Sequence, residues 1–397
     1  MTLPLEDIRV LDLTRILTGP FCTMILADLG AEVIKVEMPE SGDDTRHWGP
    51  PFIAKESAYF LSINRNKKSL TLNLKKEKGR KILYSIAKKS DVLLENFRPG
   101  VTERLKVDFK TISQINPQIV YCSISSFGQT GPYRDRLAYD LVIQGMGGLM
   151  GITGEPDHAP VRIGVAIADI GAGMYGAIAV LSAIMAQRRT KKGRRIDISL
   201  LDGTVSWLTY MAANYFATGK NPRKLGSAHP NIVPYQCFEA GDGKYLTLAV
   251  GNDSIWKNFC KAIGYERLIY DERFSTNPKR VKNRETLVDL LIKLFATRSR
   301  SEWIDALLSN EVPCGPVYTL DEIFTDPQVL HRNMVLEINH PKVGKIKQIG
   351  IPMKFSEMSS RVNVAPPLLG QHNKEILGSL LKLSEKEIKK LEQEGVI

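Results

Sequence analysis

The first half of the chain alternates short apolar runs with segments of helical periodicity, and this alternation restricts the fold more than any other feature. Short apolar runs bounded by turn residues predict strands, and longer periodic segments predict helices. Strands are expected at residues 8–13, 32–37, 70–74, 92–95 and 119–123, and helices at 21–29 and 77–89. Strands that alternate with helices pair in parallel through crossover connections. The sequence therefore predicts an α/β protein with a doubly wound parallel sheet.

The second half indicates a further domain. Helical patterns at 171–188 and 201–218 flank a strand at 195–200, and residues 219–234 then shift to Lys, Pro, Asn and Gly, which is typical of a linker. Two apolar runs at 234–240 and 244–250, separated by Gly241-Asp242-Gly243, predict a β-hairpin. Helices at 254–263, 284–297 and 301–308 and strands at 335–338 and 344–349 follow. A length of 397 residues leaves room for two domains.

The net charge of +11 raises the question of an anionic partner. The basic residues form short scattered pairs, such as Lys67-Lys68 and Lys191-Lys192, without interleaved aromatic residues, so nucleic-acid binding is not expected. We find no continuous apolar run of about 18 residues and no signal-like N-terminal segment, so we expect no membrane association and a cytoplasmic protein. The five cysteines form no CxxC pair and the six histidines have no ligand spacing, so no metal site is expected.

Asp169 is the residue best placed for chemistry. It follows an apolar run and precedes Ile170-Gly171-Ala172-Gly173, where a helix is expected to begin. The amide end of a helix favours a carboxylate, and glycines allow a ligand to approach the backbone. On local sequence alone, an ordinary aspartate N-cap is the favoured interpretation, because Asp is a preferred residue before a helix. Glycines between 145 and 154 predict either a flexible loop that closes over the site or a pair of tight turns.

Common nucleotide and hydrolase motifs are absent from the sequence. The glycines at 145–151 do not follow a strand as GxGxxG requires, so NAD binding is not expected. No GxxxxGK[ST], GxSxG or HExxH motif occurs. Arg98, Arg104, Lys75 and Arg136 suit a polyphosphate ligand if they converge in the fold.

Segments along nearly the whole chain resemble the family III CoA transferases, which include formyl-CoA and carnitine CoA transferases. The matching segments are Val10-Leu11-Asp12-Leu13-Thr14-Arg15, Gly19-Pro20-Phe21, residues 26–37, Gly42-Asp43-Asp44-Thr45-Arg46 with Trp48, residues 64–69, Glu95-Asn96-Phe97-Arg98-Pro99-Gly100, residues 139–144, Ala168-Asp169-Ile170, residues 315–317 and residues 365–372. This resemblance favours a catalytic role for Asp169 over the helix cap.

The resemblance implies a CoA transferase that moves CoA from an acyl-CoA donor to a carboxylic acid acceptor. Asp169 would be the nucleophile, passing through an aspartyl anhydride and an aspartyl-CoA thioester. CoA thioesters are substrates, and no permanently bound cofactor is implied. The implied fold is an interlocked ring-like homodimer. Its Rossmann-like large domain takes both chain ends, 1–218 and 327–397, with a linker at 219–234 and a smaller α+β domain at 235–326.

The resemblance also implies which residues bind the substrates. The positions that match CoA contacts are Leu72, Asn73, Lys75, Asn96, Phe97, Arg98, Arg104, Arg136 and Tyr139. The positions that match the substrate pocket are Arg15, Leu17, Thr18, Arg46, His47, Trp48, Gly145, Gly147 and Gly148.

Two departures from formyl-CoA transferase concern the acid. That enzyme carries His and Gln where this chain has Arg15 and Leu17, and its glycine run in the small domain is not found near residues 226–236. We therefore expect a different acyl pocket. Arg15, Arg46 and His47 are candidates to hold a second carboxylate, which suggests a dicarboxylate such as succinate.

Three alternatives remain at this stage. A 2-methylacyl-CoA racemase shares the fold, but the histidine it carries on the segment matching Tyr139-Asp140 is missing here, which favours transfer; Asp140 could still serve as a second base. The other two are a non-catalytic CoA-binding protein and a basic nucleic-acid-binding protein.

Overall fold

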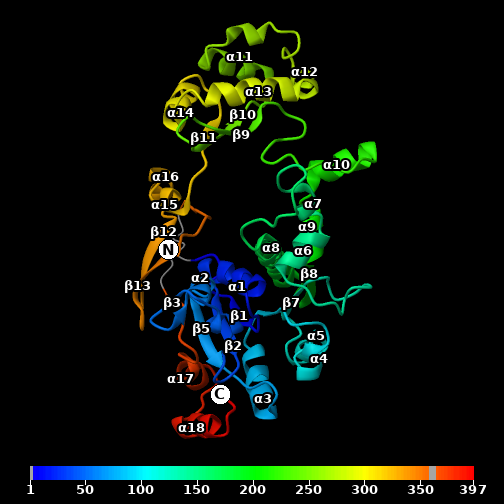
Figure 1. Cartoon of the computed structure of the whole chain (residues 1–397). Coiled ribbons are helices and arrows are strands. Elements are labelled where there is room, and N and C mark those ends of the chain that lie inside the picture. The colour runs from blue at the N-terminus through cyan, green and yellow to red at the C-terminus, as the bar shows by residue number, and fades with distance from the viewer. Residues whose placement is uncertain (1–2, 357–363) are drawn as a thin grey trace. The chain divides into compact units, whose positions relative to one another are not determined.

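A parallel sheet of six strands lies at the centre of the first compact unit in the computed structural model, which describes residues 3–356 and 364–397 (Figure 1). The strands are β1 (Arg9–Asp12), β2 (Glu32–Glu37), β5 (Lys67–Thr71), β6 (Val92–Glu95), β7 (Val120–Ser125) and β8 (Arg194–Ser199). All neighbours are parallel, in the order β5-β2-β1-β6-β7-β8. The predicted α/β class with a parallel sheet is confirmed.

The direction of strand addition reverses between β1 and β6. From β1 the chain moves outward to β2 and β5, and then returns to add β6, β7 and β8 on the other side. In open α/β sheets, ligands bind beyond the carboxyl ends of the strands at such a reversal. The segments after Asp12 and Glu95 are therefore the places where a site is expected.

The helices of the first unit connect these strands or extend from them. They are α1 (Thr18–Asp28), η1 (Asp44–His47), α2 (Ala58–Ile63), α3 (Glu77–Ala87), α4 (Val101–Leu105), α5 (Phe109–Ile115), α6 (Asp140–Met146), α8 (Ile167–Thr190), α9 (Leu200–Ser206), α16 (Pro327–His331), α17 (Asn373–Glu375), η3 (Ile376–Leu380) and α18 (Glu385–Gln393). Two hairpins, β3 (Phe52–Ile53) with β4 (Glu56–Ser57) and β12 (Val335–His340) with β13 (Gly344–Ile349), complete this unit.

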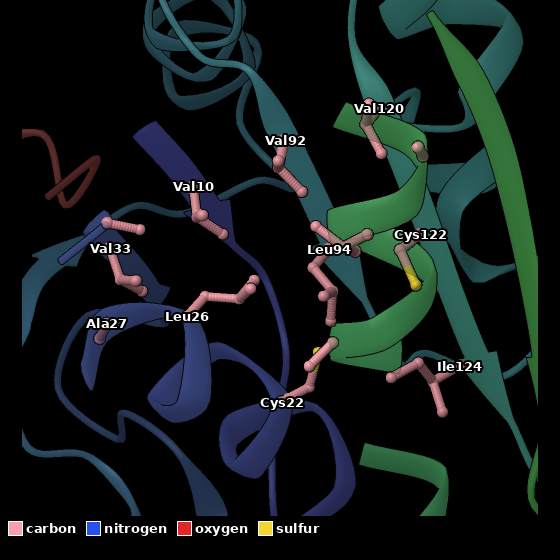
Figure 2. Packing of buried hydrophobic residues seen from close by; sticks show 14 of the residues in the cluster. Val10, Cys22, Leu26, Ala27, Val33, Val92, Leu94, Val120, Cys122 and Ile124 are labelled. Carbon is pink, nitrogen blue, oxygen red and sulfur yellow. The ribbon is translucent and has the colours of Figure 1, made fainter. Parts of the chain in front are cut away.

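Both faces of the sheet are buried, which follows from the strand sequences. Successive side chains of a strand point to opposite faces. Val10, Val33 and Val92 belong to the core that α1 and α8 cover, and Figure 2 shows Val10, Leu94 and Cys122 directed toward Cys22 and Leu26 of α1. The intervening Leu11, Ile34 and Leu93 belong to the opposite core, with residues of α3, α5 and the C-terminal helices. Strands buried on both faces give the continuous apolar runs seen in the sequence.

Three predicted elements differ from the structure. The third strand spans Lys67–Thr71 and not residues 70–74, because the Lys67 ammonium is fully buried beside Asp12 and belongs to the strand. The helix expected at 201–218 is divided into α9 and α10 (Thr209–Thr218), with a positive φ of 34° at Thr209, the first residue of α10. Residues 145–154 are largely helical, at the end of α6 and in α7 (Leu149–Ile152), and not a long flexible loop.

α8 is a 24-residue helix with an apolar composition. Among the described residues it is the one helix long and apolar enough to cross a membrane by length and composition, a test that core helices also pass. The expectation that the sequence has no apolar run of about 18 residues did not take this helix into account. Half of the residues in its most apolar 18-residue stretch are buried. The helix packs on α1, α9, β7 and β8. Its apolar character is therefore explained in good part by its place in the core.

The second compact unit comprises Met150–Val161 and Asn214–Asp326, and the first comprises Met1–Leu149, Arg162–Ala213 and Pro327–Ile397. The second unit has an antiparallel sheet of β9 (Tyr235–Glu239), β10 (Tyr245–Ala249) and β11 (Cys314–Pro316), with α11 (Asp253–Ala262), η2 (Glu266–Ile269), α12 (Asn277–Lys282), α13 (Arg284–Phe295), α14 (Arg300–Leu308) and α15 (Leu320–Ile323). The hairpin expected around Asp242 is present. The domain division at residues 218, 234 and 326 stays a prediction.

Candidate active site

Asp169 is the third residue of α8 and not its cap. The N-cap is Ala166, which makes no side-chain capping bond. A carboxylate from another helix takes that place: Asp140 Oδ1 accepts a hydrogen bond of 2.9 Å from the backbone N–H of Ala168. The N-cap interpretation of Asp169 is therefore wrong, and the Asp169 side chain is left available for another task.

One oxygen of Asp169 has a dedicated partner. The Thr18 hydroxyl, on the first residue of α1, donates a hydrogen bond to Asp169 Oδ1. Among the described residues, none donates a hydrogen bond to Oδ2. Burial raises the pKa of the Asp169 carboxyl to about 6; the Asp140 charge acts in the same direction, and the Thr18 hydroxyl opposes both. Asp169 is therefore a partly buried carboxylate with one oxygen held and one unbonded.

A tyrosine lies close enough to this carboxylate to be affected by its charge. Tyr59 of α2 meets Trp48 edge-to-face, with ring centroids 5.2 Å apart. Burial raises the pKa of the Tyr59 hydroxyl to about 12, and the charges of Asp169 and Asp140 add to that effect. Sequence reasoning included Trp48 but missed Tyr59, because nothing in the sequence relates a tyrosine on α2 to the start of α8.

A cavity of about 790 Å³ opens at the carboxyl ends of β1 and β6, where the order of strands reverses. Apolar side chains, among them Val36, Leu72 and Phe97, form part of its wall. Its basic lining residues are Arg15, Lys35, Lys75, Arg80, Arg98 and Arg104. A cavity that combines an apolar wall with several cations suits a ligand that has both a flat apolar group and phosphates.

The loop between β1 and α1, residues 13–17, runs from this cavity to Thr18. Arg15 and Ile16 line the cavity. Asn96 holds the main chain of Arg15 from both sides, since its Oδ1 accepts from Arg15 N and its Nδ2 donates to Arg15 O, each at 2.8 Å. Ile16 has a φ of +70°, which is uncommon for a β-branched residue, and its N–H donates to Asp43 Oδ1 at 3.2 Å. Side chains of two other segments thus fix the conformation of this loop.

Comparison with known proteins shows which family and which proteins the chain resembles. The sequence matches the CoA-transferase family III over residues 5–373. The chain belongs to this family. Succinyl-CoA:glutarate CoA-transferase of Mus musculus is 45% identical over 394 residues, covering 99% of this chain and 90% of that protein. Succinate--glutarate CoA-transferase of Agrobacterium fabrum is 38% identical, covering 95% and 96%. The crystal structure of a CAIB/BAIF family protein from Brucella suis is 42% identical with a TM-score of 0.85, covering 96% of this chain and 100% of that one.

The chain is thus a family III CoA transferase, and the expected CoA contacts can be located in its fold. The cavity brings together Leu72, Lys75, Asn96, Phe97, Arg98 and Arg104, which come from three segments: the one after β5, the one after β6, and α4. Asn73, Arg136 and Tyr139 do not line it. Asn73 Oδ1 accepts from Lys75 N at 3.1 Å, and the Arg136 guanidinium lies 3.7 Å from the centroid of the Tyr133 ring. Tyr139 precedes α6 and is 69% exposed.

Two of the residues expected to hold a second carboxylate in this transferase have other partners. The Arg46 guanidinium makes two hydrogen bonds of 2.7 Å to the buried Glu37 carboxylate and lies over the Phe60 ring. His47 Nε2 is 2.8 Å from Ser41 O. These contacts disfavour the expectation for Arg46 and His47. Arg15 pairs with Asp44 through side chains that are each 46% exposed, so it can exchange that partner for a substrate.

The other residues expected in the substrate pocket are Leu17, Gly145, Gly147 and Gly148. Leu17 is the buried N-cap of α1, next to Thr18. Gly145 lies inside α6, and Gly147 and Gly148 form the turn that follows it. A Cβ on Gly147 would lie 2.4 Å from Thr204 Cγ2, so close packing against α9 accounts for a glycine there. These glycines lie on elements that pack around α8, and they form a structured turn.

Proposed function

We propose that this family III transferase moves CoA between short dicarboxylic acids through covalent intermediates on Asp169. The observation that carries the proposal is the state of that carboxylate: Thr18 holds Oδ1, while Oδ2 accepts no hydrogen bond from any described residue. A carboxylate nucleophile needs one oxygen oriented and the other available.

The reaction has four steps. Oδ2 attacks the thioester carbonyl carbon of the donor; a C–O bond forms, the C–S bond breaks, and CoA leaves as the thiolate with the bonding pair. The thiolate then attacks Cγ of Asp169; a C–S bond forms, the Cγ–Oδ2 bond breaks, and the donor acid leaves as a carboxylate. The acceptor carboxylate displaces the thiolate from Cγ, giving a second anhydride. The thiolate finally attacks the acceptor's acyl carbon and restores the Asp169 carboxylate. No external proton donor or oxidant is required.

The cavity at the strand reversal is the proposed CoA site in a Rossmann-like large domain. Its apolar wall suits the adenine ring, and Lys75, Arg98 and Arg104 suit the phosphates. Arg98 Nη2 also donates to Asp135 O at 2.6 Å, which joins the segment after β6 to the loop that carries Arg136 and Tyr139. This link supports a role for that loop at the edge of the CoA site.

Dicarboxylates are proposed because the names of the two relatives given above contain succinate, or its CoA ester, and glutarate. Arg15 is the proposed partner of the distal carboxylate, because it lies on the loop next to Thr18 and its present partner is exposed. Exchange of Asp44 for a substrate carboxylate preserves the charge around the guanidinium.

Assembly into a homodimer, interlocked as in the resembling family, is also proposed. Met174, Ile178 and Met185 recur on one side of α8 and are 50%, 58% and 70% exposed. An apolar stripe of this kind on a long helix is typical of a covered interface. Light scattering on the purified protein should give twice the mass of the chain, and a monomer at all concentrations would contradict this part.

A racemase is disfavoured by the state of Asp140. Its Oδ1 accepts from Ala168 N and its Oδ2 from Gln144 Nε2 at 2.7 Å, so both oxygens already have structural partners. Deuterium exchange into a chiral 2-methylacyl-CoA without any acceptor acid would reverse this preference.

The test of function pairs an acyl-CoA screen with trapping. Succinyl-CoA is incubated with a series of mono- and dicarboxylic acids, and new thioesters are detected by mass spectrometry. Hydroxylamine added to the enzyme with donor alone should convert Asp169 to a hydroxamate, which peptide mapping locates. Asp169→Asn should retain CoA binding and lose both transfer and trapping. Transfer by the Asn variant, or trapping at another residue, would contradict the proposal.

A further inference from the structure

The Thr18 hydroxyl touches an atom that changes its bonding during the proposed reaction. It donates to Asp169 Oδ1, and Thr18 itself is only 5% exposed. In the anhydride and the aspartyl-CoA thioester, Oδ1 is the carbonyl oxygen that stays on Asp169. The same hydroxyl therefore faces the oxygen on which negative charge develops whenever Cγ is attacked.

The two helices that carry these groups hold them at a fixed separation. α1 and α8 pack against each other, and Gly173 of α8 lies at their contact. A Cβ on Gly173 would lie only 2.7 Å from the main-chain oxygen of Thr18, so the backbones approach too closely for any other residue. Thr18 is also the first residue of α1, directly after the loop that Asn96 and Asp43 hold. The donor is thus preorganised before substrate arrives.

We propose, on the basis of the function inferred above, that Thr18 is a catalytic residue that stabilises the oxyanion formed on Asp169 itself. When the CoA thiolate attacks Cγ of the anhydride, the Cγ–Oδ1 double bond opens and Oδ1 takes up the electron pair. The pair returns as the Cγ–Oδ2 bond breaks and the donor acid leaves. The acceptor carboxylate repeats this sequence with the thiolate as leaving group. Thr18 keeps its proton throughout and donates only a hydrogen bond.

A second effect of the hydroxyl concerns the resting enzyme. Asp169 is faced by Asp140 from α6 and by the Tyr59 hydroxyl from α2, and burial and the Asp140 charge both disfavour its ionised form. The Thr18 hydroxyl is the group that lowers the pKa of Asp169 against them. Removal of the hydroxyl should therefore raise that pKa and reduce the fraction of carboxylate near neutral pH.

The test uses Thr18→Val, which keeps the shape of the side chain and removes the donor, and Thr18→Ser, which keeps the donor. Loss of one oxyanion donor costs about 10²-fold in kcat. We expect a loss of that order in the Val variant with little change in KM for the acyl-CoA. Its acidic limb in the pH profile of kcat/KM should move to higher pH. The Ser variant should return kcat to within about 10-fold of the wild type, with the limb unmoved.

Stopped-flow quenching separates this role from a purely structural one. With acyl-CoA alone, the Val variant should form the aspartyl-CoA thioester slowly while its thermal unfolding stays close to that of the wild type. A Val variant with wild-type kcat and an unmoved pH profile would overturn the proposal for Thr18. If the wild type yields no hydroxylamine-sensitive adduct at Asp169, the proposed function itself fails, whatever the Thr18 variants do.

Discussion

Asp140 caps a helix that begins 27 residues after it: its Oδ1 accepts a hydrogen bond of 2.9 Å from Ala168 N, the second residue of α8. Its other oxygen accepts from Gln144 Nε2, and Gln144 Oε1 in turn accepts from Ile163 N at 2.9 Å. The segment that enters α8 is therefore held through side chains of α6. The carboxylate of Asp140 also raises the pKa of Asp169.

Asp140→Asn should shift catalysis and stability in separate ways. Loss of the negative charge lowers the pKa of Asp169, so the acidic limb of kcat/KM should move to lower pH, opposite to the effect of Thr18→Val. The amide places a donor against Gln144 and should cost about 1–3 kcal/mol in the free energy of unfolding. Chemical denaturation and a pH-rate profile measure the two effects. If the acidic limb of kcat/KM stayed in place or moved to higher pH, the Asp140 charge would not be a cause of the raised pKa of Asp169.

Asp169→Asn should make the protein more stable at neutral pH. The carboxyl of the folded chain has a pKa of about 6 against a usual 3.8, so the folded state binds more protons between these values. Stability contributed by this group therefore falls as pH rises from about 4 to 6 and stays low above that window. The wild type should be less stable than the Asn variant by up to about 3 kcal/mol at pH 7.5, with the gap narrowing toward pH 4. Urea unfolding across this range measures the gap, and a constant gap would contradict the cause.

Charge removal at the cavity should weaken CoA binding without affecting folding. Lys75→Gln and Arg104→Gln each remove an exposed cation from the lining and should raise KM for acyl-CoA by about 3- to 10-fold. The effect should shrink as salt is added, because exposed charges are screened. Lys78→Gln is the matched control, since Lys78 is exposed on α3, pairs with Glu394 and does not line the cavity. Equal changes in all three variants would exclude this cavity as the phosphate site.

Arg46→Met should unfold the protein more easily, since it leaves the Glu37 carboxylate buried without its cation. Breaking one side of a buried pair costs about 3–5 kcal/mol. Arg9→Met removes the partly exposed pair with Glu32 and should cost about 1 kcal/mol or less. Thermal and urea unfolding of both variants give the comparison. A small loss of unfolding free energy in Arg46→Met, together with a raised KM for the acceptor acid, would instead support a role for Arg46 in binding that acid.

Much of the sheet could be predicted from the sequence because its strands are buried on both faces. Glu32–Glu37 and Val92–Glu95 end where the apolar runs end, so their predicted and observed bounds coincide. β5 was displaced in the prediction because two lysines begin it. The buried Lys67 ammonium donates to Asp12 and to Pro20 O, which are distant in sequence, as well as to the nearby Asn64, and no local pattern predicts the two distant partners.

The functional site could be predicted less completely than the sheet, because its contacts, too, join residues that no local sequence pattern relates. The resemblance drew attention to Asp169 and to residues that the structure gathers around one cavity. It could not show that Asp140 caps α8, because a cap normally lies next to its helix in sequence. Nor could it show that Arg46 forms a buried ion pair with Glu37, since an ion pair between a strand and a short helix has no sequence signature.

The two hydrogen bonds between Asn96 and residue 15 make the conformation of the loop between β1 and α1 independent of the side chain at position 15. Both hydrogen bonds between Asn96 and residue 15 involve main-chain atoms of residue 15, so they can form with any residue except proline at that position. That side chain extends from a loop whose conformation Asn96 and Asp43 hold, so its replacement should leave Thr18 and Asp169 in place. If Arg15 holds the distal carboxylate as proposed, a substitution at position 15 should change which acid is accepted at little cost in folding.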